Sequence, residues 1–207
     1  MPMRLLNHLR CRLNIDGAMN GNLTYRFVEA FQLAFSLHRN QWRKGTTIPY
    51  ISHLLSVSAL ILENGGDEDQ AIAGLLHDAV EDQGGSQTLA EIRVRFGDRV
   101  ANIVAACSDS FENPKPAWIK RKTAYLEHLP RQPEDVLLVS LADKVHNCRC
   151  ILADLGVEGD KVWRRFEGGK DGTLWYYRSL ADVFRGACPS PLAEELERVV
   201  SAIESSG

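Results

Sequence analysis

The sequence has no excess of positive charge. Its 207 residues carry 24 lysines and arginines against 27 aspartates and glutamates, which gives a formal net charge of −3. Proteins that bind DNA or RNA usually carry a basic surplus that neutralises phosphates. The charge balance argues against a dedicated nucleic-acid binder, and we expect no nucleic-acid partner. A small anionic substrate is still compatible with it, because a local basic cluster is enough to hold one.

Cysteine is sparse and does not occur in a pairing pattern. The five cysteines are odd in number, and no C-x-x-C spacing occurs among Cys11, Cys107, Cys148, Cys150 and Cys188. A disulfide framework and a structural zinc knuckle are therefore not expected, and a reducing compartment fits better.

Segments suited to a membrane are also missing. No uncharged apolar run approaches the roughly 18 residues that a spanning helix needs. The first residues, MPMRLLNHLRCRLNI, lack the apolar stretch and small-residue cleavage site of a signal peptide. We expect a cytoplasmic protein with no membrane partner, and we leave a homo-oligomer open.

The patterns that are present are helical almost throughout. With 44% hydrophobic and 25% charged residues, the composition is that of a soluble globular protein. Apolar residues recur at helical spacing, and no useful alternating β pattern is visible. We predict an all-α, compact single domain of about eight to ten helices over residues 21–207, and a poorly ordered N-terminal extension over residues 1–20. The predicted helices cover 24–39, 51–62, 67–82 with Asp67 as N-cap, one opened by a capping box at 88–91, one after 97–98, 117–129, 133–155, and two after a glycine-rich break at 156–172, the last capped by Ser190.

One polar block follows a helical apolar stretch. In Leu75-Leu76-His77-Asp78-Ala79-Val80-Glu81-Asp82, two pairs of titratable residues stand four apart. On a helix they form two adjacent polar rungs, and their burial would need partners. Adjacent imidazole and carboxylate groups suit Mn²⁺, Fe²⁺ or Zn²⁺. The alternative is an acidic helix end with a surface histidine, although carboxylates there oppose the helix dipole.

Two further segments carry candidate site residues. Asp143 follows an apolar run and shares a helix face with Asn147; it is either a metal ligand or salt-bridged to Lys144 or a distant arginine. Arg43 and Lys44 begin a flexible polar loop that could hold phosphates or stack on a base. His53, after that loop, is a candidate ligand, whereas a lone histidine is more often a core or surface residue.

Together the three segments resemble a known family. The order H…HD…D is similar to the signature of the HD-domain metal-dependent phosphohydrolases. The fuller pattern R-K-x(4)-P-Y-I-x-H, L-L-H-D-x-V-E-D, F-G-x-x-V and L-A-D-K-x-x-N resembles the (p)ppGpp hydrolase domain of RelA/SpoT-type enzymes. It resembles still more their short stand-alone relatives, the small alarmone hydrolases that include metazoan SpoT homologues. The match runs from about Ala34 to Leu155, rather more than half of the chain.

The resemblance implies a role for each matching residue. The ligands of one Mn²⁺ ion, with other divalent metals left open, would be His53, His77, Asp78 and Asp143. Glu81 and Asp82 match the catalytic pair that orients and activates the attacking water. The positions that contact the nucleotide substrate are Arg43, Lys44 and Asn147.

The implied activity is hydrolysis of the 3′-pyrophosphate of (p)ppGpp to GDP or GTP and pyrophosphate. The length predicts a hydrolase without the synthetase and regulatory domains of the long enzymes. One alternative is a phosphohydrolase for another nucleotide, such as pppApp, NADPH or a nucleoside monophosphate. The other is a catalytically silent nucleotide-binding sensor, against which the complete set of metal and water residues counts.

Overall fold

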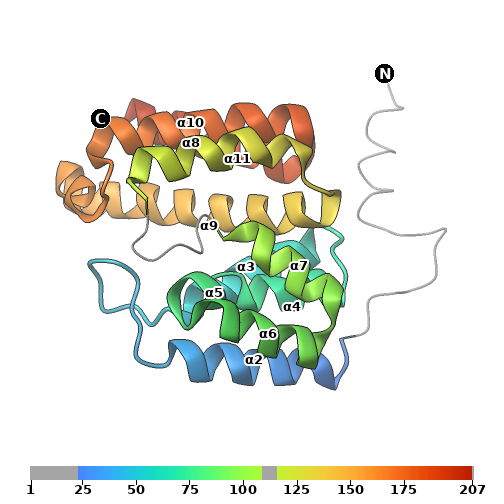
Figure 1. The fold of residues 1–207 in the computed structure, drawn as a ribbon. Coiled ribbons are helices and arrows are strands. Elements are labelled where there is room, and N and C mark those ends of the chain that lie inside the picture. Colours follow the sequence, from blue (N-terminus) through green and yellow to red (C-terminus); the bar gives the residue numbers. More distant parts are fainter. Residues whose placement is uncertain (1–22, 109–115, 207) are drawn as a thin grey trace.

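The computed structural model describes residues 23–108 and 116–206, and within these ranges the chain is a helical bundle (Figure 1). The predicted extension at residues 1–20 lies outside the described residues. No strand occurs in the described ranges, where the one β-type contact is an isolated bridge between Trp42 and Pro49. The all-α prediction is confirmed. The helices are α2 (Tyr25–His38), α3 (Ile51–Glu63), α4 (Glu68–Leu76), α5 (Ala79–Asp82), α6 (Gly85–Phe96), α7 (Asp98–Cys107), α8 (Trp118–His128), the 3₁₀ turn η1 (Leu129–Arg131), α9 (Glu134–Glu158), the 3₁₀ helix η2 (Gly159–Arg165), α10 (Gly169–Ala187) and α11 (Pro191–Ser205).

Helix α9 is the centre of the bundle. It crosses the molecule between a group formed by α2 to α7 and a group formed by α8, α10 and α11 (Figure 1). It packs against α3, α4 and α7 on one side and against α10 and α11 on the other. A helix covered on both sides must be apolar on more than one face. Accordingly, α9 buries residues all along its length: Val136, Leu137, Val139, Leu141, Ala142, Val145, Cys148, Ile151 and Leu155.

Helix starts follow the predicted capping chemistry at two places. The Asp67 side chain accepts from the backbone N–H of Gln70, whose own side chain accepts from the Asp67 N–H, a complete capping box. The Ser190 hydroxyl accepts from the N–H of Ala193, and Pro191 is the first residue of α11. Both N-caps confirm the sequence prediction.

Two boundary predictions between α4 and α6 are wrong. The helix expected over 67–82 is interrupted at His77 and Asp78, which separate α4 from α5. The capping box expected at Thr88 does not open a helix, because α6 already begins at Gly85, and the Thr88 hydroxyl donates instead to the carbonyl of Gln83 (2.9 Å). Gly84, at φ 131°, makes the turn directly before that helix, so the chain passes from α5 to α6 within two residues.

The expected break over 156–172 is also mostly helical. Helix α9 continues to Glu158, η2 follows at once, and α10 begins at Gly169. Pro133 is the N-cap of α9 rather than its first helical residue. Because the chain turns back directly after α9, both η2 and α10 pack against α9.

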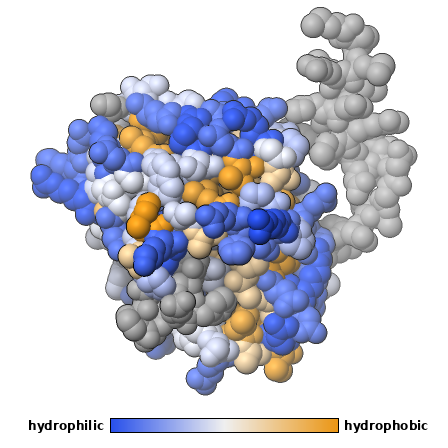
Figure 2. Space-filling model, turned by 45° about the horizontal axis from the view of Figure 1, so that its top comes forward, coloured by the Kyte–Doolittle hydropathy of each residue, from blue (hydrophilic) through white to orange (hydrophobic). Residues whose placement is uncertain are grey.

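On the side drawn in Figure 2, apolar residues form small patches between hydrophilic ones and no large hydrophobic patch. Over the described residues, none of the helices combines the length and the apolarity that crossing a bilayer requires.

Candidate active site

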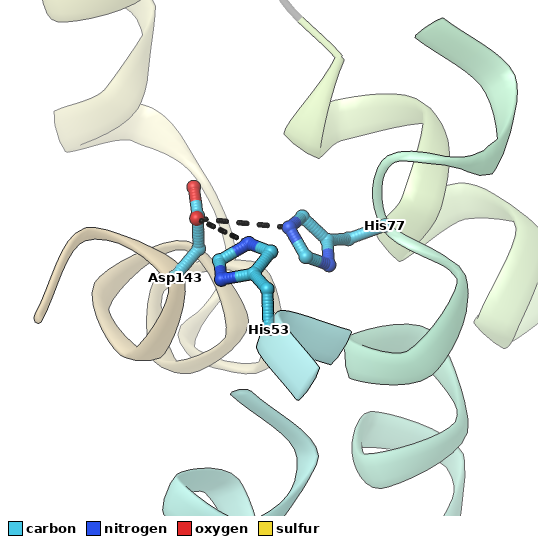
Figure 3. Close-up of side chains that lie close together, drawn as sticks. All are labelled: His53, His77 and Asp143. Atoms are coloured by element: carbon cyan, nitrogen blue, oxygen red, sulfur yellow. Dashed lines mark ion pairs between the residues drawn. The ribbon is translucent and has the colours of Figure 1, made fainter. Parts of the chain in front are cut away.

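Two histidines and an aspartate converge from three helices. His53 comes from α3, His77 from the turn after α4, and Asp143 from the middle of α9 (Figure 3). Asp143 Oδ1 lies 3.3 Å from His53 Nε2 and 3.6 Å from His77 Nε2. One ligand atom from each residue lies within 4.8 Å of the others, and all three side chains are buried. This spacing matches a divalent metal site.

Asp78 closes the same cluster from a fourth direction. Its Oδ2 lies 3.0 Å from His77 Nε2 and 3.6 Å from His53 Nε2, and it accepts a hydrogen bond from the Tyr50 hydroxyl (2.6 Å). The break between α4 and α5 falls at His77 and Asp78 themselves, so both side chains leave the chain at a turn rather than on a continuous helix face. The structure thus brings together all four residues that the sequence analysis named as ligands.

The outer ring nitrogens show which atoms face the cluster. Nδ1 of His77 lies 2.8 Å from the carbonyl oxygen of Gly74, which can only accept, so this nitrogen carries the proton. Nδ1 of His53 lies 2.8 Å from Nδ1 of His146. The Nε2 atoms of His53 and His77 are buried and have no hydrogen-bond partner within the described part of the chain. A metal-binding histidine typically presents one ring nitrogen to the ion while a hydrogen bond at the other ring nitrogen fixes the orientation of the ring. His53 and His77 meet both conditions, so these residues fit a divalent cation.

The electrostatics of the cluster favour a cation there. Burial opposes the charged form of Asp143, yet the neighbouring Lys144 ammonium holds the pKa of that carboxyl well below its usual range. Burial likewise acts against protonated His77, but the carboxylates of Asp78 and Asp143 outweigh it and raise the pKa of that imidazole well above its ordinary value. The charge of His77 likewise holds the pKa of Asp78 well below its usual range against the effect of burial, so both carboxylates are ionised at neutral pH and attract positive charge to the Nε2 atoms.

The two acidic residues expected to handle water lie on α5, directly after Asp78. Asp82 Oδ2 accepts from the side-chain amide of Gln41 (2.8 Å). Partial burial, together with the nearby charge of Asp78, raises the pKa of Asp82. Glu81 is half-buried beside it. Their catalytic roles stay predictions.

A cleft of about 510 Å³ adjoins the cluster. All three predicted substrate-binding residues, Arg43, Lys44 and Asn147, line it. Arg43 donates to Asn147 Oδ1 (2.6 Å), and Asn147 in turn donates to Asp143 Oδ1. The guanidinium of Arg43 also lies over the Tyr50 ring, 5.6 Å from its centroid. The cleft has the size of a small-molecule site, and its wall is continuous with the ligand cluster.

Several lining residues were not singled out from the sequence as site residues. Tyr50 and His146 flank motif positions, and their place in the quoted patterns was the available signal. Asp154, Arg165 and Phe166 lie beyond the last motif, where no pattern pointed to them. In the aromatic run Trp175-Tyr176-Tyr177 of α10, Tyr177 lines the cleft, whereas Tyr176 is buried.

Comparisons with known proteins agree with this geometry. A family model described as HD domain matches residues 30–174. A guanosine-3′,5′-bis(diphosphate) 3′-pyrophosphohydrolase, MESH1 of Xenopus tropicalis, is 40% identical over 125 residues, which are 59% of this chain and 67% of that protein. MESH1 of Homo sapiens is 36% identical over 134 residues, 62% of this chain and 71% of its own. A solved structure reported as a metazoan orthologue of SpoT that hydrolyses ppGpp has a TM-score of 0.72 at 25% identity, covering 87% of this chain and 96% of that one.

Proposed function

Because the chain belongs to the HD-domain family, we propose that it hydrolyses the 3′-pyrophosphate of guanosine tetra- or pentaphosphate, releasing GDP or GTP and pyrophosphate. The observation that carries the proposal is the pair of buried Nε2 atoms of His53 and His77, which have no hydrogen-bond partner among the described residues and face Asp143 beside a nucleotide-sized cleft. The named activity of the relatives from Xenopus tropicalis and Homo sapiens supports it.

The ion of this proposal is one divalent metal, held by His53, His77, Asp78 and Asp143. Two imidazole nitrogens and two carboxylates form a mixed donor set that suits Mn²⁺, which is our first candidate, and other divalent ions are accepted by the same donors. When bound, such an ion supplies a water of lowered pKa and offsets charge on the phosphate.

The residues of α5 act on the attacking water. Glu81 accepts its proton while the water oxygen forms a bond to the phosphorus attached to the ribose 3′-oxygen. The bond between that phosphorus and the 3′-oxygen breaks, and the proton taken up by Glu81 returns to the leaving oxygen, which becomes the 3′-hydroxyl. Asp82, held by Gln41 and raised in pKa, orients the water.

The cleft holds the rest of the nucleotide. Arg43 and Lys44 neutralise phosphate charge, which is the task that fixed cations perform in phosphoryl transfer. Asn147 couples this wall to the metal ligands, because it accepts from Arg43 and donates to Asp143. A substrate that displaces Arg43 from Asn147 would therefore change the hydrogen bonding of Asp143, a proposed metal ligand.

The test is the release of pyrophosphate from ppGpp by the purified chain with added Mn²⁺. We expect GDP and pyrophosphate in equal amounts, and no release in the presence of a chelator. Turnover of NADPH or pppApp without any turnover of ppGpp would overturn the assignment of the substrate.

A further inference from the structure

Helix α9 carries a line of side chains from the metal ligands to the far end of the cleft. Asp143, Asn147 and Asp154 follow one another at intervals of four and seven residues, the spacing of a single helix face. Asn147 and Asp154 both line the cleft. At about 1.5 Å of rise per residue, Asp154 lies about 16 Å along α9 from the metal ligand. With side chains reaching in from both ends, this is a span that a nucleoside 3′-pyrophosphate can fill.

Asp154 is held in place by an arginine clamp. Arg165 donates from Nη1 to Asp154 Oδ2 (2.5 Å), and its Nη2 is paired with Glu158. The stem of Arg165 lies against Gly45, which has a φ of +73° and where an added Cβ would come within 2.8 Å of Arg165 Cδ. Glu158, unlike Asp154 and Arg165, is not part of the cleft wall. The clamp fixes Asp154 through Oδ2 and leaves Oδ1 without a hydrogen bond to the residues described.

The carboxylate of Asp154 has no equivalent in the cleft wall. Among the described residues that line the cleft, no other side chain is acidic. The Watson–Crick edge of guanine presents two neighbouring N–H donors, whereas the same edge of adenine presents a ring-nitrogen acceptor that a carboxylate would repel. A site built to accept hydrogen bonds discriminates strongly against an analogue that cannot donate them.

We propose that Asp154 is a specificity-determining residue that selects guanine over adenine by accepting the N1–H and the 2-amino group of the base. This inference rests on the proposed nucleotide hydrolysis, since it places the 3′-pyrophosphate at the metal ligands and the base three turns of α9 away. Arg165 acts as a positioning residue for the Asp154 carboxylate.

The decisive comparison is between Asp154→Asn and Glu158→Gln in the full chain. Each variant replaces one carboxylate partner of Arg165 by an amide, but only Asp154 lines the cleft. For each protein, kcat/KM is measured on guanosine and on adenosine 3′,5′-bis(diphosphate) with Mn²⁺. We expect wild type to prefer guanosine, D154N to lose about tenfold to a hundredfold of that preference, and E158Q to keep it.

A second readout does not depend on catalysis. Calorimetric binding of GDP, IDP and ADP to the metal-free protein should rank GDP above IDP, which lacks the 2-amino group, and D154N should bind the two equally. If wild type hydrolyses neither bis(diphosphate), the proposed function fails, and the binding series still decides the role of Asp154. An unchanged base preference in D154N, or an equal loss in E158Q, would overturn the inference.

Discussion

The two ends of the site on α9 are built in different ways. At one end, called the metal end after its proposed ion, His53, His77 and Asp143 are 1%, 3% and 6% exposed, and a neighbouring group contacts each of them on the side away from the cluster or beside it. At the other end, Asp154 and Arg165 lie at the rim of an open cleft and hold each other by charge. In the proposed function, the reaction therefore takes place at a desolvated cluster, whereas the base is recognised by a carboxylate whose side chain is 32% exposed and paired with Arg165.

The largest effect is expected at the metal end. Asp78→Ala removes a carboxylate that faces both ligand imidazoles. We expect loss of the bound ion and a fall in kcat of about a thousandfold or more, because several kcal/mol of charge stabilisation disappear. Metal content by mass spectrometry and turnover of ppGpp measure both effects. A variant that keeps its metal and its rate would show that the buried cluster is not the reactive centre.

The next effect separates metal binding from water activation. Glu81→Gln keeps the shape of the side chain and should leave metal content unchanged while lowering kcat by about a hundredfold to ten thousandfold. Asp82→Asn serves as the comparison, because it keeps a partner for Gln41 but removes a carboxylate of raised pKa. Equal metal loss in both variants would instead assign these residues to the ligand set.

A smaller effect is expected from the groups that hold the ligands. Tyr50→Phe removes the hydroxyl that donates to Asp78 Oδ2 and leaves the ring that lies under Arg43. We expect metal affinity or kcat to fall by about tenfold to a hundredfold. Titration of the metal-free protein with Mn²⁺ gives the affinity. If KM rises while metal affinity stays the same, Tyr50 acts on the substrate from the cleft wall and its bond to Asp78 does not support the metal ligands.

The smallest effect concerns a buried histidine outside the ligand set. Burial lowers the pKa of His38, whose ring stacks on Tyr50 and whose Nδ1 contacts Gln41. The unfolded chain therefore binds a proton at higher pH than the folded one, so stability is full above the ordinary histidine pKa and declines as pH falls below it. Urea unfolding midpoints between pH 7 and pH 5 should fall less in His38→Gln than in wild type. Parallel curves would assign the decline to other groups.

The four residues of the buried cluster could be predicted from the sequence because the signals that mark them are local. His77 and Asp78 are adjacent, Asp143 and Asn147 are one helical turn apart, and an ionisable group after an apolar run needs a partner. What the sequence did not reveal is the break at His77 and Asp78, where helical periodicity continues although the helix ends. Tertiary contacts of the two side chains override the local pattern there.

The other end of the site, at Asp154 and Arg165, could not be predicted from the sequence. Arg165 and Asp154 are eleven residues apart, and they meet because α9 runs on to Glu158 and η2 turns back against it. A glycine-rich segment had predicted a break in this region, since glycine disfavours helix interiors. With that boundary misplaced, the clamp on Asp154 and the position of Tyr177 could not be inferred.

The proposed metal centre is tested most directly by an anomalous diffraction map from crystals grown with Mn²⁺. We expect one strong peak enclosed by the Nε2 atoms of His53 and His77 and by the carboxylates of Asp78 and Asp143, and no such peak in the Asp78→Ala variant. A map with no peak there, or with the ion bound elsewhere in the cleft, would show that these four side chains do not form the metal centre.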